Sequence, residues 1–289
     1  MIYVICNPVA GNGRGKKIGE QVQAELQKHG IPHEFYLTKS RDHATELAKK
    51  AAALGAEKVL AVGGDGTVLE VARGLIHTQT ALCIIPGGTG NDFIKTIGLP
   101  KDPAAALEAA LTNAPRKTDA VQLNDRLFLN EAGVGFDVSV LEYAKKAKKY
   151  CRGLLPYLYG VIRTIFSFSG IRLVCQLEGG EKVEREILVL GVGNGRFIGG
   201  GIEIAPEAVP DDGLLDVVIV EKMKKPRMMQ VLPLLLKGKI LTFKETEWTR
   251  VKRLSFQGEH MSVNVDGEIL PMDKAEISIL PDALYVCRP

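Results

Sequence analysis

Three glycines surround an aspartate directly after a buried, strand-like run of the chain. The run Lys58–Val62 leads into Gly63-Gly64-Asp65-Gly66-Thr67, and Thr67 with Glu70 has the spacing of a capping box, which predicts a helix beginning there. Glycines let backbone N–H groups approach a phosphate closely, and a helix N-terminus favours anions. A carboxylate beside phosphates is repulsive unless it holds a metal or takes a proton, so Asp65 favours phosphoryl transfer over passive binding. An ordinary tight turn from strand to helix is the alternative interpretation.

A second glycine-rich loop, Pro86-Gly87-Gly88-Thr89-Gly90-Asn91-Asp92, follows the next strand-like run. Two further polar features, Asn7-Pro8 and Thr38, follow the first two runs. Ligands of a parallel sheet bind outside the carboxyl ends of its strands, and all four features are expected at that edge. The sequence therefore predicts a nucleotide site there.

Two familiar phosphate motifs are absent from the N-terminal loop. A P-loop ending at Gly15-Lys16 would need glycine in place of Ala10 and Ser or Thr in place of Lys17. The glycines at positions 11, 13 and 15 also have the wrong spacing for a dinucleotide fingerprint. Arg14, Lys16 and Lys17 can contact phosphate or form a solvated basic helix start, and both readings stay open.

Strand and helix patterns alternate through about the first 120 residues, which predicts a parallel, Rossmann-like sheet with helices on both faces. The expected strands are Ile2–Cys6, His33–Leu37, Val59–Val62 and Ala81–Ile85. The expected helices are about 15–29, Asp42–Leu54, Val68–Ile76 and Ala104–Leu111, the last opened by Asp102-Pro103.

The rhythm changes after about residue 120, where strand-like segments follow one another and turn signals separate several of them. The segments are Leu173–Glu178, Glu184–Val192, Leu214–Val220, Arg250–Phe256, Met261–Val265 and Glu276–Leu280, with helical insertions at about 137–150 and 226–238. This pattern predicts a mainly antiparallel β-sandwich. We expect two domains, 1–121 and 122–289, with the last few residues able to pack back on the first.

Composition excludes several classes of protein. The chain has 289 residues, 46% apolar and 25% charged, as in globular proteins, and its net charge of +3 is too small to argue for nucleic-acid binding. Five cysteines without a Cys-x-x-Cys spacing argue against a disulfide framework and a cysteine zinc site. No signal peptide and no run of about 18 apolar residues is present, so a cytoplasmic chain without a membrane span is expected.

The two glycine loops together resemble the diacylglycerol kinase catalytic domain, and more narrowly the soluble bacterial lipid kinases. The first loop is shared with NAD kinases, whereas the second is much more specific to lipid kinases. The resemblance extends over the whole chain. Residues 130–137 are similar to the family's entry into its second domain, residues 209–214 to its magnesium loop, and residues 265–268 to its late catalytic motif.

The resemblance implies a two-domain fold with the active site in the cleft between the domains, and ATP and Mg²⁺ as cofactors. Glu268 is implied as the base that deprotonates the lipid hydroxyl, although Asp65 competes for that role, and Asp65 and Asp92 as organisers of the catalytic magnesium. Asp212 is implied as a magnesium ligand, with the carbonyls of Val209 and Leu214. The implied ATP-binding residues are Asn7, Pro8, Val9, Thr38, Gly63, Gly64, Asp65, Gly66, Thr67, Glu70, Gly88, Thr89 and Asn91.

Without the resemblance, two of these segments are ordinary turns. Asp266-Gly267 followed by Glu268 is typical of a hairpin turn with an exposed acid, and Asp211-Asp212-Gly213 of a plain turn. An EF-hand is excluded because the alternating acids and the acid at loop position twelve are missing.

Two basic segments beside apolar residues suit an anionic membrane interface. Lys145, Lys146, Lys148, Lys149 and Arg152 precede residues 154–159, and basic residues flank the apolar stretch 228–236. A solvated basic helix face is the alternative for each. We therefore expect a protein held peripherally on the inner face of the membrane, in an oligomeric state that the sequence does not reveal.

The expected function is an ATP-dependent lipid kinase that transfers the γ-phosphate to a lipid hydroxyl, with diacylglycerol first among the acceptors and phosphatidic acid as product. Sphingoid bases, phosphatidylglycerol and polyprenols stay open as acceptors. An NAD kinase is an alternative that the second loop argues against. A non-catalytic lipid or nucleotide sensor is another, which the full set of acids argues against.

Overall fold

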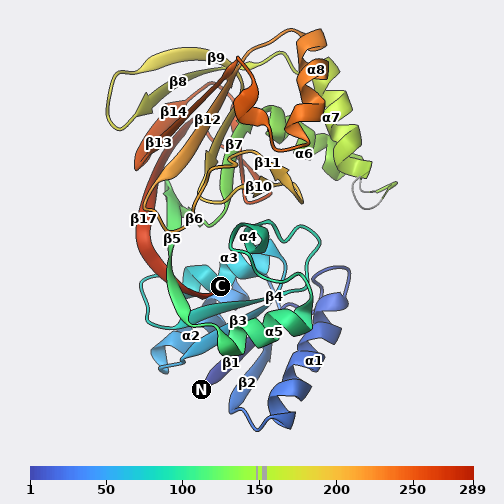
Figure 1. Cartoon of the computed structure of the whole chain (residues 1–289), viewed down its shortest axis with the longest axis vertical. Helices are drawn as coiled ribbons and strands as arrows, with labels where there is room; N and C mark the ends of the chain where they lie inside the picture. Colours follow the sequence, from blue (N-terminus) through green and yellow to red (C-terminus); the bar gives the residue numbers. More distant parts are fainter. Residues whose placement is uncertain (148, 152–154) are drawn as a thin grey trace. The chain divides into compact units, whose positions relative to one another are not determined.

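The computed structural model describes residues 1–147, 149–151 and 155–289. These residues divide into two compact units (Figure 1). The first contains Met1–Ala120, Pro210–Asp212 and Leu280–Pro289, and the second contains Val121–Val209 and Gly213–Ile279. The C-terminal segment therefore belongs to the same unit as the N-terminus.

Parallel strands in the order β4-β3-β1-β2 form the sheet of the first unit, as predicted. Their bounds are β1 Ile2–Cys6, β2 His33–Leu37, β3 Lys58–Gly63 and β4 Ala81–Pro86. β1, β3 and β4 are buried along their whole length, which is why they are continuous apolar runs, whereas the edge strand β2 is mostly half-buried. The end of β17 (Lys274–Cys287) adds to this sheet, with Tyr285 opposite Ala81 in parallel.

Helices cover both faces of this sheet. On one face, the predicted stripe Ile18, Val22 and Leu26 of α1 and the alanines of α5 pack into a single core with β1, β3 and β4. On the other, α2 and α3 pack so closely that a Cβ at Gly74 would lie 2.6 Å from the Cβ of Ala48. The bounds are α1 Arg14–Lys28, α2 His43–Ala53, α3 Asp65–Leu75, α4 Asp92–Thr96 and α5 Pro103–Thr112.

The second unit is built on a mainly antiparallel sheet, as predicted, in the order β16-β15-β7-β9-β8-β14-β17, with β12 between β9 and β13. Its inward-facing side chains form one core, which includes Phe128, Leu190 and Phe256. The bounds are β5 Pro115–Leu123, β6 Arg126–Phe128, β7 Glu131–Gly135, β8 Ile171–Leu177, β9 Val183–Gly193, β12 Leu215–Glu221, β13 Thr246–Val251, β14 Arg253–Gln257, β15 Ser262–Val265 and β16 Glu268–Pro271. The expected single strand Arg250–Phe256 is wrong, because the chain passes from β13 to β14 at Lys252 and the two strands have different partners.

Helices α6, α7 and α8 lie together beside this sheet (Figure 1) and enclose a second apolar core with β9 and β12. Their bounds are α6 Phe136–Ala147, α7 Leu155–Ser167 and α8 Lys225–Leu235, followed by a short 3₁₀ turn, η1 Ile240–Thr242. A small ribbon of β10 Phe197–Ile198 and β11 Ile202–Glu203 completes the unit. Among the described residues, none of the helices combines the length and the apolar character that crossing a bilayer requires.

Candidate active site

Three loops meet at the carboxyl edge of the parallel sheet because the ends of their strands are in register. Cys6 lies opposite Val62 and Gly63 opposite Pro86, so the loops after β1, β3 and β4 begin at the same level. Asn7 Nδ2 donates to Thr67 Oγ1 over 3.0 Å, which joins the first loop to α3. The predicted convergence of these loops is therefore present.

Most of the loop glycines are required by packing between the loops themselves. The amide of Gly87 donates to the carbonyl of Gly63 over 2.7 Å, and a Cβ on Gly88 would lie 2.5 Å from the Cα of Gly64. A Cβ on Gly63 would meet the side chain of Thr67 at 2.4 Å. These residues bring two stretches of backbone into contact that no side chain would allow.

Gly66 differs from its neighbours because a Cβ there would meet nothing within 4 Å. It lies exposed in the first turn of α3, where backbone N–H groups have no partner within the helix. Protein packing does not require glycine at this position, whereas the close approach of a phosphate to the helix N-terminus would.

Replacing Gly66 with alanine is expected to weaken ATP binding at least about tenfold while leaving stability equal or higher by about 0.5–1 kcal/mol, since alanine favours a helix. Isothermal titration and urea unfolding measure the two effects. In the control, Gly88→Ala, overpacking against Gly64 is expected to cost about 1–3 kcal/mol of stability. Unchanged ATP affinity in Gly66→Ala would show that the phosphates of ATP do not bind at this end of α3.

Asp65 holds the second glycine loop in place. Its carboxylate accepts hydrogen bonds from the backbone amides of Asn91 (2.7 Å) and Asp92 (2.9 Å), the first residues of the α4 region. Burial raises the pKa of Asp65, as does the negative charge of Asp92, while the backbone hydrogen bonds oppose the shift. Asp65 thus caps a helix distant in sequence, a structural role that the sequence did not reveal.

The predicted capping box at Thr67 and Glu70 is wrong. α3 begins three residues earlier than the box predicts, at Asp65 rather than Val68, with Gly64 as its N-cap and without a side-chain cap. The hydroxyl of Thr67 instead accepts a hydrogen bond from the side-chain amide of Asn7. The carboxylate of Glu70 accepts a hydrogen bond from the backbone amide of Ala44 in the first turn of α2 (3.3 Å). Glu70 therefore stabilises the start of a neighbouring helix, where an anion is favoured.

The remaining predicted ATP residues lie around the same edge. Asn91 adopts a left-handed conformation, and its side chain donates to the carbonyl of Gly88. Asp92, which is predicted as an organiser of the catalytic magnesium, is buried and pairs with Lys95 (2.7 Å). Thr89 and Val9 are exposed, and Pro8 and Thr38 are half-buried, with the amide of Thr38 donating to Cys6. Their roles in ATP binding stay predictions.

In the second unit, Glu268 follows a two-residue hairpin turn between β15 and β16. Asp266 and Gly267 both have positive φ, 47° and 87°, which is the type I′ geometry, and Val265 pairs with Glu268. The carboxylate of Asp266 accepts from the three consecutive amides of Leu129, Asn130 and Glu131. This clamp holds the hairpin against the start of β7, with Glu268 half-buried beside the turn.

The segment implied as a magnesium loop is divided between the units. Asp212 is exposed and groups with the first unit, whereas Val209 and Leu214 group with the second. The neighbouring Asp211 pairs with the buried Arg288, so one acid of this turn anchors the C-terminus. Within the described ranges, no three His, Cys, Asp or Glu side chains gather closely enough to hold a metal ion. Magnesium binding by Asp212 stays a prediction.

An apolar pocket lies inside the second unit, between α6, α7 and α8 and strands β9 and β12. Its cavity volume is about 100 Å³, and only Asp137 and Asn264 bring charged or amide groups to its lining. The other lining residues include Tyr157, Val161, Ile165, Leu188, Met228, Val231 and Phe243. Sequence reasoning did not find this pocket, because its walls come from elements that are far apart in the chain.

Asp137 is the polar end of this pocket. Its Oδ2 accepts from Asn264 Nδ2 (3.2 Å), and its Oδ1 has no hydrogen-bond partner within the described part of the chain. Burial raises its pKa to about 6. Asn264 Oδ1 also accepts a hydrogen bond from the backbone amide of Gly267 (3.0 Å), so the Asn264 side chain links the pocket to the turn that precedes Glu268. In the sequence, Asp137 directly follows Gly135-Phe136 at the end of a strand, and this was the pattern from which a site residue could have been suspected.

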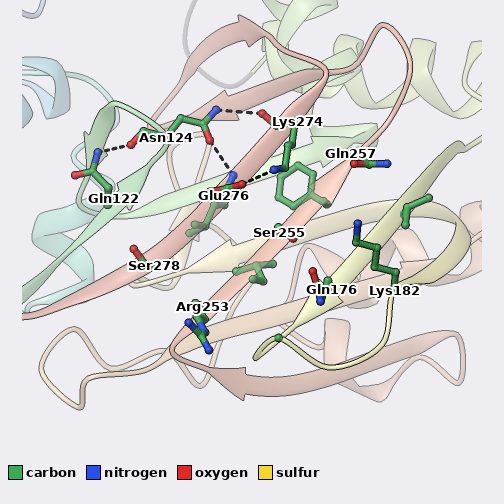
Figure 2. Close-up of a pocket in the computed structure, with 15 residues that line it drawn as sticks. Gln122, Asn124, Gln176, Lys182, Arg253, Ser255, Gln257, Lys274, Glu276 and Ser278 are labelled. Carbon is green, nitrogen blue, oxygen red and sulfur yellow. Dashed lines mark hydrogen bonds and ion pairs between the residues drawn. The ribbon is translucent and has the colours of Figure 1, made fainter.

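A second hollow, of about 480 Å³, has the opposite character (Figure 2). It lies on β8, β14 and β17 and is lined by amides, hydroxyls and charges of both signs. Asn124 joins Lys274 and Glu276 in one hydrogen-bonded group there. None of the predicted site residues lines it.

Comparisons with known proteins show the family and the fold of both domains. The chain matches the family "Diacylglycerol kinase catalytic domain" over residues 1–123 and the "YegS C-terminal NAD kinase beta sandwich-like domain" over residues 130–288. Among solved structures, a diacylglycerol kinase from Bacillus anthracis shares the fold with a TM-score of 0.76 at 23% identity, covering 100% of this chain and 96% of that one. An NAD kinase from Archaeoglobus fulgidus, in complex with ATP, has a TM-score of 0.54 at 14% identity, covering 100% and 94%.

Curated relatives match along nearly the whole chain. A diacylglycerol kinase of Mycobacterium tuberculosis is 29% identical and is matched over 100% of this chain and 95% of its own length. A Pseudomonas putida protein named "Probable lipid kinase YegS-like" is 36% identical over 92% of this chain and 88% of its own. The chain belongs to the diacylglycerol kinase catalytic-domain family, with the C-terminal domain of the YegS-like lipid kinases.

Proposed function

We propose that this protein is an ATP-dependent kinase that phosphorylates the hydroxyl of a membrane lipid, with diacylglycerol as the first acceptor to test. The observation that carries the lipid assignment is the apolar pocket, which ends at Asp137 and is joined through Asn264 to the turn beside Glu268. A water-soluble acceptor such as NAD would have no use for a lining of this kind.

On the nucleotide side, the exposed start of α3 at Gly66 would receive phosphate oxygens, and the packed glycine loops would hold its N–H groups in position. Carboxylate and carbonyl oxygens are the donors that Mg²⁺ prefers, and Asp65 keeps lone pairs beyond its two backbone hydrogen bonds. Asp65 and Asp92 are therefore the residues that would hold a catalytic Mg²⁺, and Asp212 would be a ligand of a separate magnesium at its own turn. When bound, Mg²⁺ supplies neutralisation of phosphate charge.

On the acceptor side, Glu268 would take the proton of the lipid hydroxyl, while acyl carbons occupy the apolar pocket. Asp137 and Asn264 would meet polar groups of the lipid where its chains begin. Pockets that bind drug-sized ligands usually measure about 300–1,000 Å³. The apolar pocket measures about 100 Å³, so α7 or α8 must shift before a lipid chain can enter it.

Labelled ATP incubated with a panel of acceptors tests the proposal. The panel contains diacylglycerol, a sphingoid base, phosphatidylglycerol, a polyprenol and NAD, and each product is identified by mass. Phosphate transfer to one of the lipids, with diacylglycerol expected first, supports a lipid kinase. Phosphorylation of NAD alone would assign the NAD kinase reaction, and the absence of any transfer despite ATP binding would assign a sensor.

A further inference from the structure

Helix α7 is apolar on both faces. Its inner face, which includes Tyr157, Val161 and Ile165, lines the apolar pocket. Its outer face carries large apolar side chains spaced three or four residues apart, each 45–61% exposed: Leu155, Leu158, Tyr159, Ile162 and Phe166. A helix that is apolar all round is normally buried on every side, so the outer face has the character of a contact surface.

Positive charge is concentrated in the stretch of sequence that contains this face. Residues 141–170 contain six lysines and arginines and one acid, Glu142. Lys145, Lys146 and Lys149 are exposed at and after the end of α6, and Tyr150 beside them is 91% exposed. An apolar stripe flanked by lysines and aromatic side chains complements an anionic lipid surface. Such a surface attracts each nearby lysine, so a cluster of lysines binds more strongly than one. Two copies of this chain facing each other here would oppose like charges.

The other basic segment, 222–239, is less suited to this role because several of its charges already have partners. Arg227 pairs with Glu245 through two nitrogens, at 3.0 and 3.1 Å, and Lys222 pairs with Glu186 at 2.6 Å. Lys225 donates to the carbonyl of Phe166 at the end of α7. The contact of Lys225 joins α8 to α7, and the three contacts together leave less charge for an external surface.

We propose that the outer face of α7, with Lys145, Lys146 and Lys149, docks on an anionic bilayer. Docking would place the helix that covers the apolar pocket at the membrane surface, where movement of α7 admits a lipid acceptor from the bilayer. The proposal rests on the proposed lipid kinase function. Lys148, Arg152 and Leu154, which belong to the same predicted cluster, lie outside the described residues.

Vesicle flotation without ATP tests the docking directly. The full chain is mixed with vesicles of phosphatidylcholine alone or of phosphatidylcholine with phosphatidylglycerol. We expect binding to the anionic vesicles, reduced at least about tenfold in Leu158→Gln/Ile162→Gln because two inserted side chains are lost. Lys145→Glu/Lys146→Glu is expected to remove the preference for anionic vesicles. The matched control, Leu54→Gln/Val183→Gln, changes exposed apolar residues outside α7 and is expected to bind like the wild type.

Equal binding by the wild type and Leu158→Gln/Ile162→Gln would overturn the proposal. So would a concentration-dependent wild-type dimer, seen by gel filtration and abolished by the same variant, because it would assign the face to a second copy. Turnover of a short-chain diacylglycerol dispersed in detergent separates docking from function. Turnover without vesicle binding overturns docking and leaves the lipid kinase intact, whereas vesicle binding without turnover of any lipid overturns the kinase and leaves docking intact.

Discussion

Replacing Glu268 with glutamine is expected to lower kcat by about 10²–10⁴-fold, the usual contribution of a positioned general base. Glutamine has nearly the same shape and cannot take a proton from the acceptor hydroxyl. Because Glu268 lies beside a turn that Asp266 and Asn264 hold, the turn itself is expected to survive the change. Steady-state turnover of the preferred lipid measures kcat and KM, and urea unfolding checks that stability is unchanged.

The neighbouring Asp266 provides the matched control for this experiment. Its carboxylate accepts three backbone amides, so Asp266→Asn is expected to cost about 1–3 kcal/mol of stability. A loss of turnover in Glu268→Gln without a loss of stability separates a chemical role from the structural role of its neighbour.

Asp65→Asn forms the second arm of the experiment, because Asp65 competes with Glu268 for the role of base. An asparagine presents one acceptor oxygen to two backbone amides, so this variant is expected to lose both stability and turnover, unlike Glu268→Gln. Near-normal turnover in both variants would refute the assignment of either acid to the reaction. A pH–rate profile that loses its acidic limb in only one variant identifies the base.

The pH dependence of stability is expected to carry a large contribution from Asp137. Its pKa rises from 3.8 to about 6 on folding, because burial disfavours the charged form. The folded state therefore binds a proton more tightly, and the free energy of unfolding falls as pH rises from about 4 to about 6, by about 3 kcal/mol in total. Asp137→Asn is expected to remove this fall, so the variant gains stability relative to the wild type as pH increases.

Urea unfolding of both proteins across this pH range measures the effect. Asp282→Asn serves as the control, because Asp282 is an exposed partner of Lys117 and such pairs contribute about 0–1 kcal/mol. Parallel stability curves for the wild type and Asp137→Asn would contradict the prediction.

Much of the fold was predictable because local patterns and tertiary structure agree. Ile2–Cys6 and His33–Leu37 match their predicted bounds, and the cap at Asp102 accepts the amide of Ala105 as its Asp-Pro sequence indicates. The failures occur where a tertiary contact outweighs a local signal. Thr67 resembles an N-cap, yet its hydroxyl binds Asn7 and the helix begins at Asp65. α7 is absent from the predicted helices, because large apolar side chains lie on its exposed face as well as on its buried one.

The candidate site divides in the same way. The glycine loops were identifiable from the sequence because their glycines and acids stand at short, fixed spacings, and the order of strands and helices decides which edge of the sheet carries them. The glycines needed for packing between the loops could not be told apart from Gly66, because only the approach of the two backbones distinguishes them.

From the sequence alone follow the class of each domain, the edge of the parallel sheet that carries the glycine loops, and the family, because these depend on spacings within short segments. Only the tertiary structure decided that Asp65 caps α4, that Asn264 links the turn before Glu268 to Asp137, and that α6, α7 and α8 enclose an apolar pocket. The physical reason is that hydrogen bonds and cavities join residues distant in the chain, and no local pattern of residue types encodes such a contact.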